Sequence, residues 1–308
     1  MTSMRISSCL ALLVLVPACS APESVASVEE ELSSTPYVEM TSRLDSAQLA
    51  FWETASAGLI HSFDDVCGDT YCSGDYANLS TIALTCSIND AGRVKQCGWK
   101  LGGSIEYVDG ATGQFSLDAR TFNCIIPVKS DVNTFLTALD DNAFYIKGPL
   151  PTGDSFYHGI GACLAGVVGD PPPASTGTTY QEIADYFNDH GDPGFWFGTR
   201  RNVAEAFDAS CASTYCQGEW SHITALRFVC STNQETGEVK SCRFTFAASN
   251  PTVNENGHVG GPRKILQCKI KTHGPAAALE AALSGSDPLH ATLPGSGTTI
   301  ASQLDSCL

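Results

Sequence analysis

The clearest pattern along this chain is an alternation of apolar and polar residues on either side of a tight turn at residues 90–93. A period of two is typical of a β-strand with one buried face, so residues 82–101 are predicted to form a β-hairpin. With Ala91 and Gly92 as its loop, the facing pairs are Cys86 with Cys97, Leu84 with Trp99, and Ile82 with Leu101.

The same pattern returns in residues 226–246, with one additional residue at the turn. A three-residue loop of Glu235, Thr236 and Gly237 absorbs the insertion if Gly237 adopts the left-handed conformation that glycine tolerates. The expected facing pairs are then Cys230 with Cys242, Phe228 with Phe244, and Leu226 with Phe246.

A third strand and two flanking helices complete each predicted unit. The third strand covers residues 122–128 in the first copy and 266–270 in the second. Apolar residues at three- and four-residue spacing predict a helix over residues 44–63, and Ser130 is a plausible N-cap for a helix that follows the third strand. The fold class is therefore α+β, each unit being helix, three-stranded antiparallel sheet, helix, with one face of the sheet covered.

Cysteines repeat together with the strands. Between residues 63–101 and 207–246 we count 14 identities over 39 positions, against the roughly 6 to 7% expected by chance. We therefore expect two tandem, duplicated disulfide-rich domains, at residues 37–164 and 180–308, joined by a Pro/Gly/Ser/Thr linker at 165–179. The matching cysteines are Cys67, Cys72, Cys86, Cys97, Cys124 and Cys163 in the first copy, and Cys211, Cys216, Cys230, Cys242, Cys268 and Cys307 in the second.

The N-terminal residues carry a targeting pattern. One basic residue precedes an apolar run at residues 6–16 that is too short to span a bilayer, which is typical of a secretory signal over residues 1–18. The sequence Val16-Pro17-Ala18-Cys19 resembles the lipobox of bacterial lipoproteins, with Pro17 as a departure from the usual pattern. The resemblance implies lipidation of Cys19, a membrane anchor and an outer-membrane or cell-surface location; the alternative is secretion after ordinary cleavage near Ala21. Residues 19–36 are expected to form a flexible tether.

Net charge and the pattern of cysteines exclude some classes of partner and site. The formal net charge of −16 repels phosphate backbones, so nucleic acid is not an expected partner. An even, duplicated cysteine set behind a secretory signal favours disulfides over zinc ligation, because no Cys-x2-Cys knuckle is present. Among the possible connectivities we favour Cys86 with Cys97 and Cys230 with Cys242, with the same topology in both units.

A search for catalytic motifs finds none. The sequence contains no Gly-x-Ser-x-Gly elbow, no phosphate-binding glycine-rich loop and no His-Glu-x-x-His motif, and it predicts no cofactor. Each of the seven histidines aligns with another residue type in the other copy, which disfavours a histidine base in each unit.

The best candidate for recognition is the loop from Cys67 to Tyr76 and its counterpart from Cys211 to Trp220. Both keep Thr-Tyr-Cys-x-Gly followed by an acid and a large aromatic residue, which is typical of a pinned binding loop. The competing interpretation is that the aromatics pack the helix end against the sheet. The candidate ligand-binding residues are Tyr71, Asp75, Tyr76, Tyr215, Glu219 and Trp220.

Two other features suggest sites. Acidic residues crowd the first copy of the loop and make calcium a weaker alternative there, with Asp64, Asp65, Asp69 and Asp75 as ligands. The run Phe195-Trp196-Phe197 follows a Gly- and Pro-containing interruption of the second unit's opening helix, and it is expected either to pack in the core or to form an exposed lid.

Together these features predict an extracytoplasmic protein with two homologous binding domains whose partner is a protein or a glycan. A hydrolase with its site in one copy or between the domains, using His158, His190 or His222, is the first alternative. An inhibitor of extracellular proteases is the second.

Overall fold

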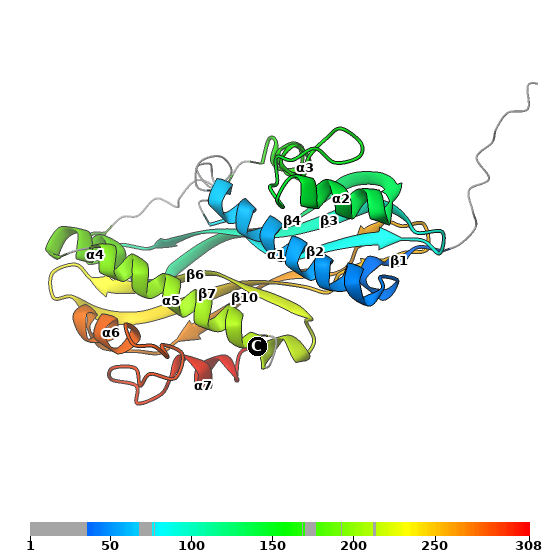
Figure 1. Ribbon diagram of the computed structural model, residues 1–308. Helices are drawn as coiled ribbons and strands as arrows, with labels where there is room; N and C mark the ends of the chain where they lie inside the picture. Colours follow the sequence, from blue (N-terminus) through cyan, green and yellow to red (C-terminus); the bar gives the residue numbers. More distant parts are fainter. Residues whose placement is uncertain are drawn as a thin grey trace, which may run out of the picture. The chain divides into compact units, whose positions relative to one another are not determined.

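The first half of the chain forms one antiparallel sheet with helices on one of its faces. In this computed structural model the sheet has the strand order β1-β2-β3-β4 (Figure 1). Its elements are β1 (Val38–Glu39), a 3-10 helix (Met40–Ser42), α1 (Ser46–Cys67), β2 (Ser80–Ile88), β3 (Arg93–Val108), β4 (Phe115–Asp131), α2 (Val132–Asp141) and α3 (Phe156–Leu164).

The second half forms another antiparallel sheet, with the order β10-β7-β6-β5 and β11 also paired with β7. Its elements are β5 (Tyr180–Glu182), α4 (Ile183–His190), α5 (Pro193–Cys211), a 3-10 helix (Tyr215–Gln217), β6 (His222–Asn233), β7 (Glu238–Ser249), β8 (Thr252–Val253), β9 (Val259–Gly260), β10 (Arg263–Ile270), β11 (Gly274–Pro275), α6 (Ala276–Leu283) and α7 (Ile300–Leu304).

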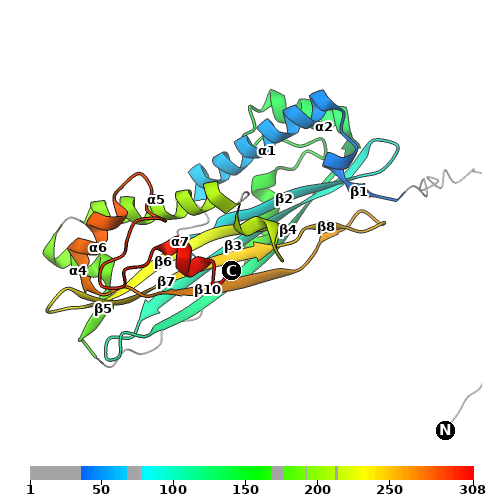
Figure 2. The same ribbon diagram turned by 90° about the horizontal axis from the view of Figure 1, so that it is seen from below.

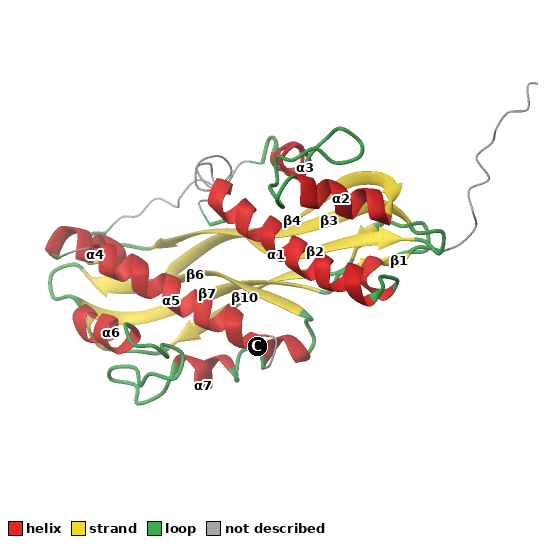
Figure 3. Ribbon diagram, viewed as in Figure 1, coloured by secondary structure: helices red, strands yellow, loops and turns green. Residues whose placement is uncertain are grey.

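The structure describes residues 36–67, 76, 78–167, 169, 177–191, 193–211 and 214–308. They belong to one compact unit that begins at residue 35. Within this part of the chain the fold is mixed, with helices packed on antiparallel sheets, as the α+β prediction requires (Figure 3). No helix in these ranges is both long and apolar enough to cross a bilayer.

Each sheet buries its apolar face under its own helices. In the first half, Trp99 on β3 contacts the rings of Phe63 on α1 and Phe156 on α3, with centroids 5.7 and 5.4 Å apart. In the second half, Phe207 on α5 packs on Phe246 at 4.5 Å. Helices and sheet therefore share a hydrophobic core in each half, built from the alternating apolar positions that predicted the strands.

The opposite faces of the two sheets pack against each other. The layers run from α1, α2 and α3 through the two sheets to α5, α6 and α7 (Figure 1). The contact is close because its residues are small: a Cβ placed on Gly102 of β3 would lie 2.4 Å from the Cβ of Ala247 on β7. The expectation that only one face of each sheet is covered was therefore wrong, since small and polar residues, which suggested a solvent-facing surface, line a buried interface instead.

Two of the three facing pairs predicted in each hairpin are correct. Cys86 faces Cys97 and Leu84 faces Trp99, as do Cys230 with Cys242 and Phe228 with Phe244. A β-bulge then shifts each register, so that Leu101 faces Thr81 and Phe246 faces Ala225. The displaced residues, Ile82 and Leu226, turn into the contact between the sheets, where they pack with Ala247.

The first hairpin loop was predicted wrongly as Ala91 and Gly92. A register shift near the turn places Ile88 opposite Val94. The N–H of Asn89 donates to the carbonyl of Arg93, so the loop covers residues 90–92.

Local turn and cap predictions had mixed outcomes. Gly237 has a φ of +71° at the end of its hairpin loop, as predicted, and the second opening helix is interrupted between α4 and α5. The N-cap of α2 is Asp131 rather than Ser130, because the Asp131 carboxylate accepts a hydrogen bond from the backbone N–H of Thr134 at 2.9 Å.

Five disulfides have both of their cysteines within the described residues. The two hairpin pairs, Cys86–Cys97 and Cys230–Cys242, are confirmed. Cys124–Cys163 and Cys268–Cys307 each span 39 residues, so this pairing has the same topology in both halves. Cys211 pairs with Cys216, and Cys67 is also disulfide-bonded, whereas Cys72 lies outside the described residues.

Candidate functional site

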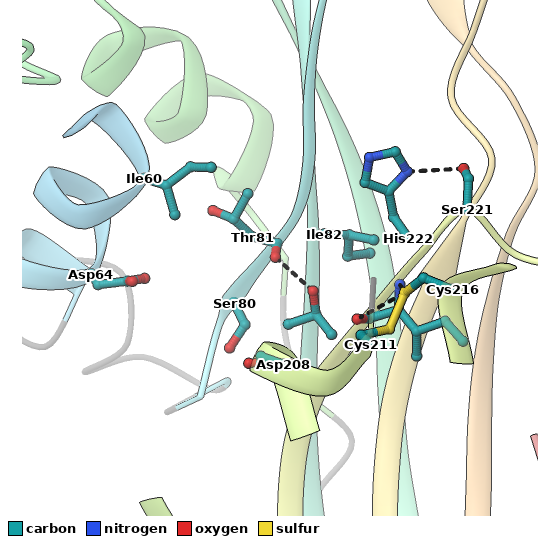
Figure 4. Close-up of a pocket in the computed structure, with 12 residues that line it drawn as sticks. Ile60, Asp64, Ser80, Thr81, Ile82, Asp208, Cys211, Cys216, Ser221 and His222 are labelled. Carbon is teal, nitrogen blue, oxygen red and sulfur yellow. Dashed lines mark hydrogen bonds between the residues drawn. A yellow bond between two sulfur atoms is a disulfide. The ribbon is translucent and has the colours of Figure 1, made fainter. Parts of the chain in front are cut away.

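Two neighbouring cavities lie where the C-terminal ends of α1 and α5 approach the edge formed by β2 and β6. Both helices follow this edge of the sheets (Figure 2). The cavities have volumes of about 460 and 610 Å³, and both are lined by Asp64, Ser80 and Asp208; Figure 4 shows the smaller one. We treat them as one groove, named here the carboxylate groove.

The two aspartates occupy equivalent positions in the two halves. Asp64 and Asp208 are separated by the same 144 residues as the cysteines, and each lies three residues before the last cysteine of its helix. Each follows a fully buried phenylalanine, Phe63 or Phe207, that anchors the helix on its sheet. The helix ends are therefore fixed by the cores, and both carboxyl groups line the same groove.

Partial desolvation raises the pKa of both carboxyl groups, although both side chains remain exposed to solvent. Desolvation raises the pKa of Asp64 to about 6, an effect opposed by His61 and increased by Asp65. Desolvation also raises the pKa of Asp208 to about 6, against a hydrogen bond from the backbone N–H of Ala225 at 3.0 Å and with a further rise from the charge of Asp64. Near pH 6 each group therefore exchanges between a carboxylic acid that can donate a hydrogen bond and a carboxylate that can only accept.

Polar contacts between the two halves form the wall of the groove beside these acids. The hydroxyl of Thr224 donates to the carbonyl of Thr81 at 2.9 Å, which joins β6 to β2 (Figure 4). Asn78 donates to the hydroxyl of Ser104 at 2.9 Å and to the carbonyl of Leu226 at 3.0 Å. These hydrogen bonds hold the polar groups of the wall in fixed positions. The groove therefore has its shape before a ligand binds.

An aromatic ring and basic side chains line the larger cavity on the α5 side. Phe197 is 47% exposed, and the guanidinium of Arg200 lies 5.2 Å from its ring centroid. Arg200 also approaches Glu182 at 3.6 Å, whereas Arg201 is exposed. Trp196 between the two phenylalanines is fully buried and Phe195 is 70% exposed, so the aromatic run divides between the core and the surface.

Histidine chemistry is weakly supported in this groove. Ser221 Oγ lies 2.9 Å from Nδ1 of His222, but within the described ranges no carboxylate reaches this ring. Burial lowers the pKa of His222, with Lys100 acting in the same direction and Glu39 opposing it. His158 pairs with Asp154 at 3.1 Å on an exposed surface, and His190 contacts the carbonyl of Tyr186, so neither assembles a catalytic triad in the residues described.

The predicted recognition loops are only partly visible. Tyr71 and Asp75 lie outside the described residues. Tyr76 and Trp220 are buried core residues, and the Tyr76 hydroxyl donates to Asp118 at 3.0 Å. Tyr215 stacks on Phe207 and Glu219 is exposed. The Cys211–Cys216 disulfide lines the smaller cavity, so the second copy of the loop borders the carboxylate groove, and its ligand-binding role stays a prediction.

The calcium alternative gains no support in the described part of the chain. Asp69 and Asp75 lie outside it, and Asp65 pairs with His61 at 3.7 Å on the surface. Among the described residues, no three His, Cys, Asp or Glu side chains are arranged to hold a metal ion.

The sequence alone does not predict that these residues form a groove. It suggests Asp64 only as a calcium ligand and Phe197 only as part of an aromatic run. The one available signal was the conserved offset of 144 residues between Asp64 and Asp208, which pairs two acids in front of equivalent cysteines. Comparison with known proteins adds no further guide, because no protein-family model, curated protein or solved structure matches this chain.

Proposed function

We propose that this chain is a tandem duplication of one disulfide-bonded unit, that it acts outside the cytoplasm as a lipid-anchored protein, and that it binds a glycan in the carboxylate groove. The equivalent disulfides of the two halves and their shared bulge positions support the duplication. The disulfides favour an oxidising compartment. Mass spectrometry of the N-terminal peptide tests lipidation, since an unmodified Cys19 would refute the lipid anchor.

The observation that carries the binding proposal is the composition of the groove. It combines the carboxyl groups of Asp64, Glu205 and Asp208 with hydroxyl groups, guanidinium groups and one exposed ring. A sugar presents hydroxyl groups that both donate and accept hydrogen bonds, together with apolar C–H faces that pack on aromatic rings. Concave sites with a few convergent polar groups are the usual places for such ligands.

A glycan fits better than a flat protein surface. Stable protein interfaces bury about 800 Å² on each partner and have an apolar core. The carboxylate groove is concave and its lining mixes polar and apolar groups, with Phe197 as the exposed aromatic group at its side. The two halves contribute equivalent acids, so consecutive sugars of a repetitive glycan would meet similar groups.

A glycan array followed by calorimetry tests this proposal. Phe197→Ala is expected to weaken binding about tenfold, or about 1.4 kcal/mol, because the stacking surface is lost. Phe195→Ala is the matched control, since Phe195 is more exposed and lies two residues away but does not line the groove.

Two neighbouring aspartates provide a second pair of test and control variants. Asp64→Ala is expected to reduce affinity by a similar factor, whereas Asp65→Ala, whose side chain is exposed outside the groove, leaves it within twofold. No glycan binding, equal losses from groove and control variants, or capture of a protein in place of a glycan would each overturn the proposal.

Hydrolysis of the bound glycan is a second candidate function, favoured by the paired acids of raised pKa. Glycosidases use one carboxylic acid to protonate the leaving oxygen and one carboxylate to activate water or attack carbon. The pKa of each of Asp64 and Asp208 is raised to about 6, so the acid and carboxylate forms of both groups are populated near that pH. Release of reducing ends with an optimum near pH 6, abolished by Asp208→Asn, would establish hydrolysis; binding without release would restrict the protein to recognition.

A further inference from the structure

A third cavity lies where the end of β3 meets β5 and the start of α4, and its lining residue Glu182 pairs with Arg200 and Arg227 of the carboxylate groove. Its volume is about 290 Å³, and its lining includes Glu106, Gln181, Glu182, Asp185 and Gln234. One water requires roughly 15 Å³ of such space, so the cavity admits a molecule of several heavy atoms. We refer to it as the acidic cavity.

Polar atoms in its wall lack partners inside the protein. Glu106 is 4% exposed; its carboxylate accepts a hydrogen bond from the hydroxyl of Thr245, but its Oε2 atom has no hydrogen-bond partner in the described structure. Nε2 of Gln181 is likewise buried without a partner among the residues described. A buried polar atom without a partner is costly, which indicates that a bound molecule completes this site.

The lining is acidic. Three carboxyl side chains, of Glu106, Glu182 and Asp185, line the cavity, and no lysine, arginine or histidine is among its described lining residues. Glu182 is paired with Arg227 at 3.1 Å and with Arg200 at 3.6 Å. Asp185 has no ion pair in the described part of the chain, so it is available to a ligand together with Oε2 of Glu106.

The backbone around the cavity is preformed. The carbonyl of Gly110 accepts hydrogen bonds from the N–H groups of Thr179 and Tyr180, at 2.8 and 2.9 Å. The N–H of Gln234 donates to the carbonyl of Thr179 at 2.9 Å. The turn after β3, the chain before β5 and the turn after β6 are thus tied together, so a ligand would not have to order them.

We propose that the acidic cavity binds a small organic cation through a primary ammonium group, with Glu106 and Asp185 as its carboxylate partners. An ammonium group has three donors and a positive charge, which match the free Oε2 atom of Glu106 and the Asp185 carboxylate, neither of which has an ion pair among the described residues. The carbon chain of the cation occupies volume that a bare ion would leave empty. This site is independent of the glycan proposal.

Calorimetry of the whole protein with putrescine tests the proposal. The neutral isostere 1,4-butanediol is the control ligand, and we expect it to bind at least tenfold more weakly. Asp185→Asn is expected to weaken putrescine binding about tenfold, whereas Asp189→Asn, one turn later on the exposed face of α4 and outside the cavity, should change it less than twofold.

The pH dependence of putrescine binding, measured with the Glu106→Gln variant, provides an independent test. Burial raises the pKa of Glu106 to about 7, opposed by Thr245, Arg243 and Arg227 and increased by Glu182. Binding should therefore strengthen five- to tenfold between pH 6 and 8, and Glu106→Gln should remove most of this dependence while the circular dichroism spectrum stays unchanged. Absence of heat up to 10 mM putrescine, equal binding of the diol, or equal losses from Asp185→Asn and Asp189→Asn would overturn the proposal.

Discussion

At the scale of single residues, Lys100 departs furthest from ordinary burial. Its side chain is fully buried between the sheets, and Nζ has no hydrogen-bond partner among the described residues. Burial lowers the pKa of Lys100 to about 8, with Arg263 acting in the same direction and Glu39 opposing it. The folded protein therefore carries a penalty for this charge at neutral pH.

Lys100→Met is expected to raise the free energy of unfolding by about 1–3 kcal/mol at pH 7, because it removes a poorly solvated charge at similar volume. In the wild type the folded pKa lies below the unfolded one, so stability rises with pH between about 8 and 10.5, and the advantage of the variant should vanish by pH 10.5. Urea unfolding at pH 7 and 10.5 measures this, with the exposed Lys264→Met as control; a destabilised Lys100→Met variant would contradict it.

Individual residues also show which structural features can be predicted from the sequence alone. Cys86, Trp99 and Phe228 were placed correctly because large apolar side chains at alternate positions identify a core face. Lys100 occupies an alternate position on the other face, where a lysine indicates solvent. Its burial depends on the second sheet, a contact between distant segments that periodicity does not encode.

At the scale of elements, the close approach of β3 and β7 depends on small residues. Gly102→Ala would place a Cβ 2.4 Å from that of Ala247, and we expect it to destabilise the fold by about 1–3 kcal/mol through overpacking. Gly260→Ala is the control, because nothing lies within 4 Å of its added Cβ.

A double-mutant cycle distinguishes overpacking from a simple strand effect. Ala247→Gly alone should cost about 1 kcal/mol, but combined with Gly102→Ala it should restore part of the lost stability, since the methyl group is exchanged across the contact. Strictly additive effects in chemical denaturation would show that the two elements do not meet as described. The bulges at Ile82 and Leu226 belong to the same contact, and they escaped prediction because both residues fit an apolar alternation on either face.

At the scale of the whole molecule, the two halves are joined by a buried and partly polar interface. The sequence suggests two tethered domains, because a Pro- and Gly-rich segment at residues 165–179 is typical of a linker. Composition near a linker does not reveal whether the domains it joins have complementary faces. The structure provides such faces, with Gly102 against Ala247 and Glu106 hydrogen-bonded to Thr245.

Cleavage of the linker is therefore expected to leave the halves associated. A protease site inserted between residues 167 and 177, cut under native conditions, should give two fragments that elute together in size-exclusion chromatography, because the sheets and not the linker hold them. Separate elution at neutral pH without denaturant would contradict this expectation.

The association should also depend on pH with a definite sign. The pKa of Glu106 is raised to about 7 in the folded protein from 4.5, so the interface is most stable below pH 4.5 and loses stability as pH rises to about 7. Asp64 and Asp208, raised from 3.8 to about 6, contribute in the same direction. Cut fragments should therefore separate at lower urea concentration at pH 7.5 than at pH 4.5, and Glu106→Gln should narrow that difference. An unchanged difference in the Glu106→Gln protein would mean that this buried acid does not govern how the halves hold together.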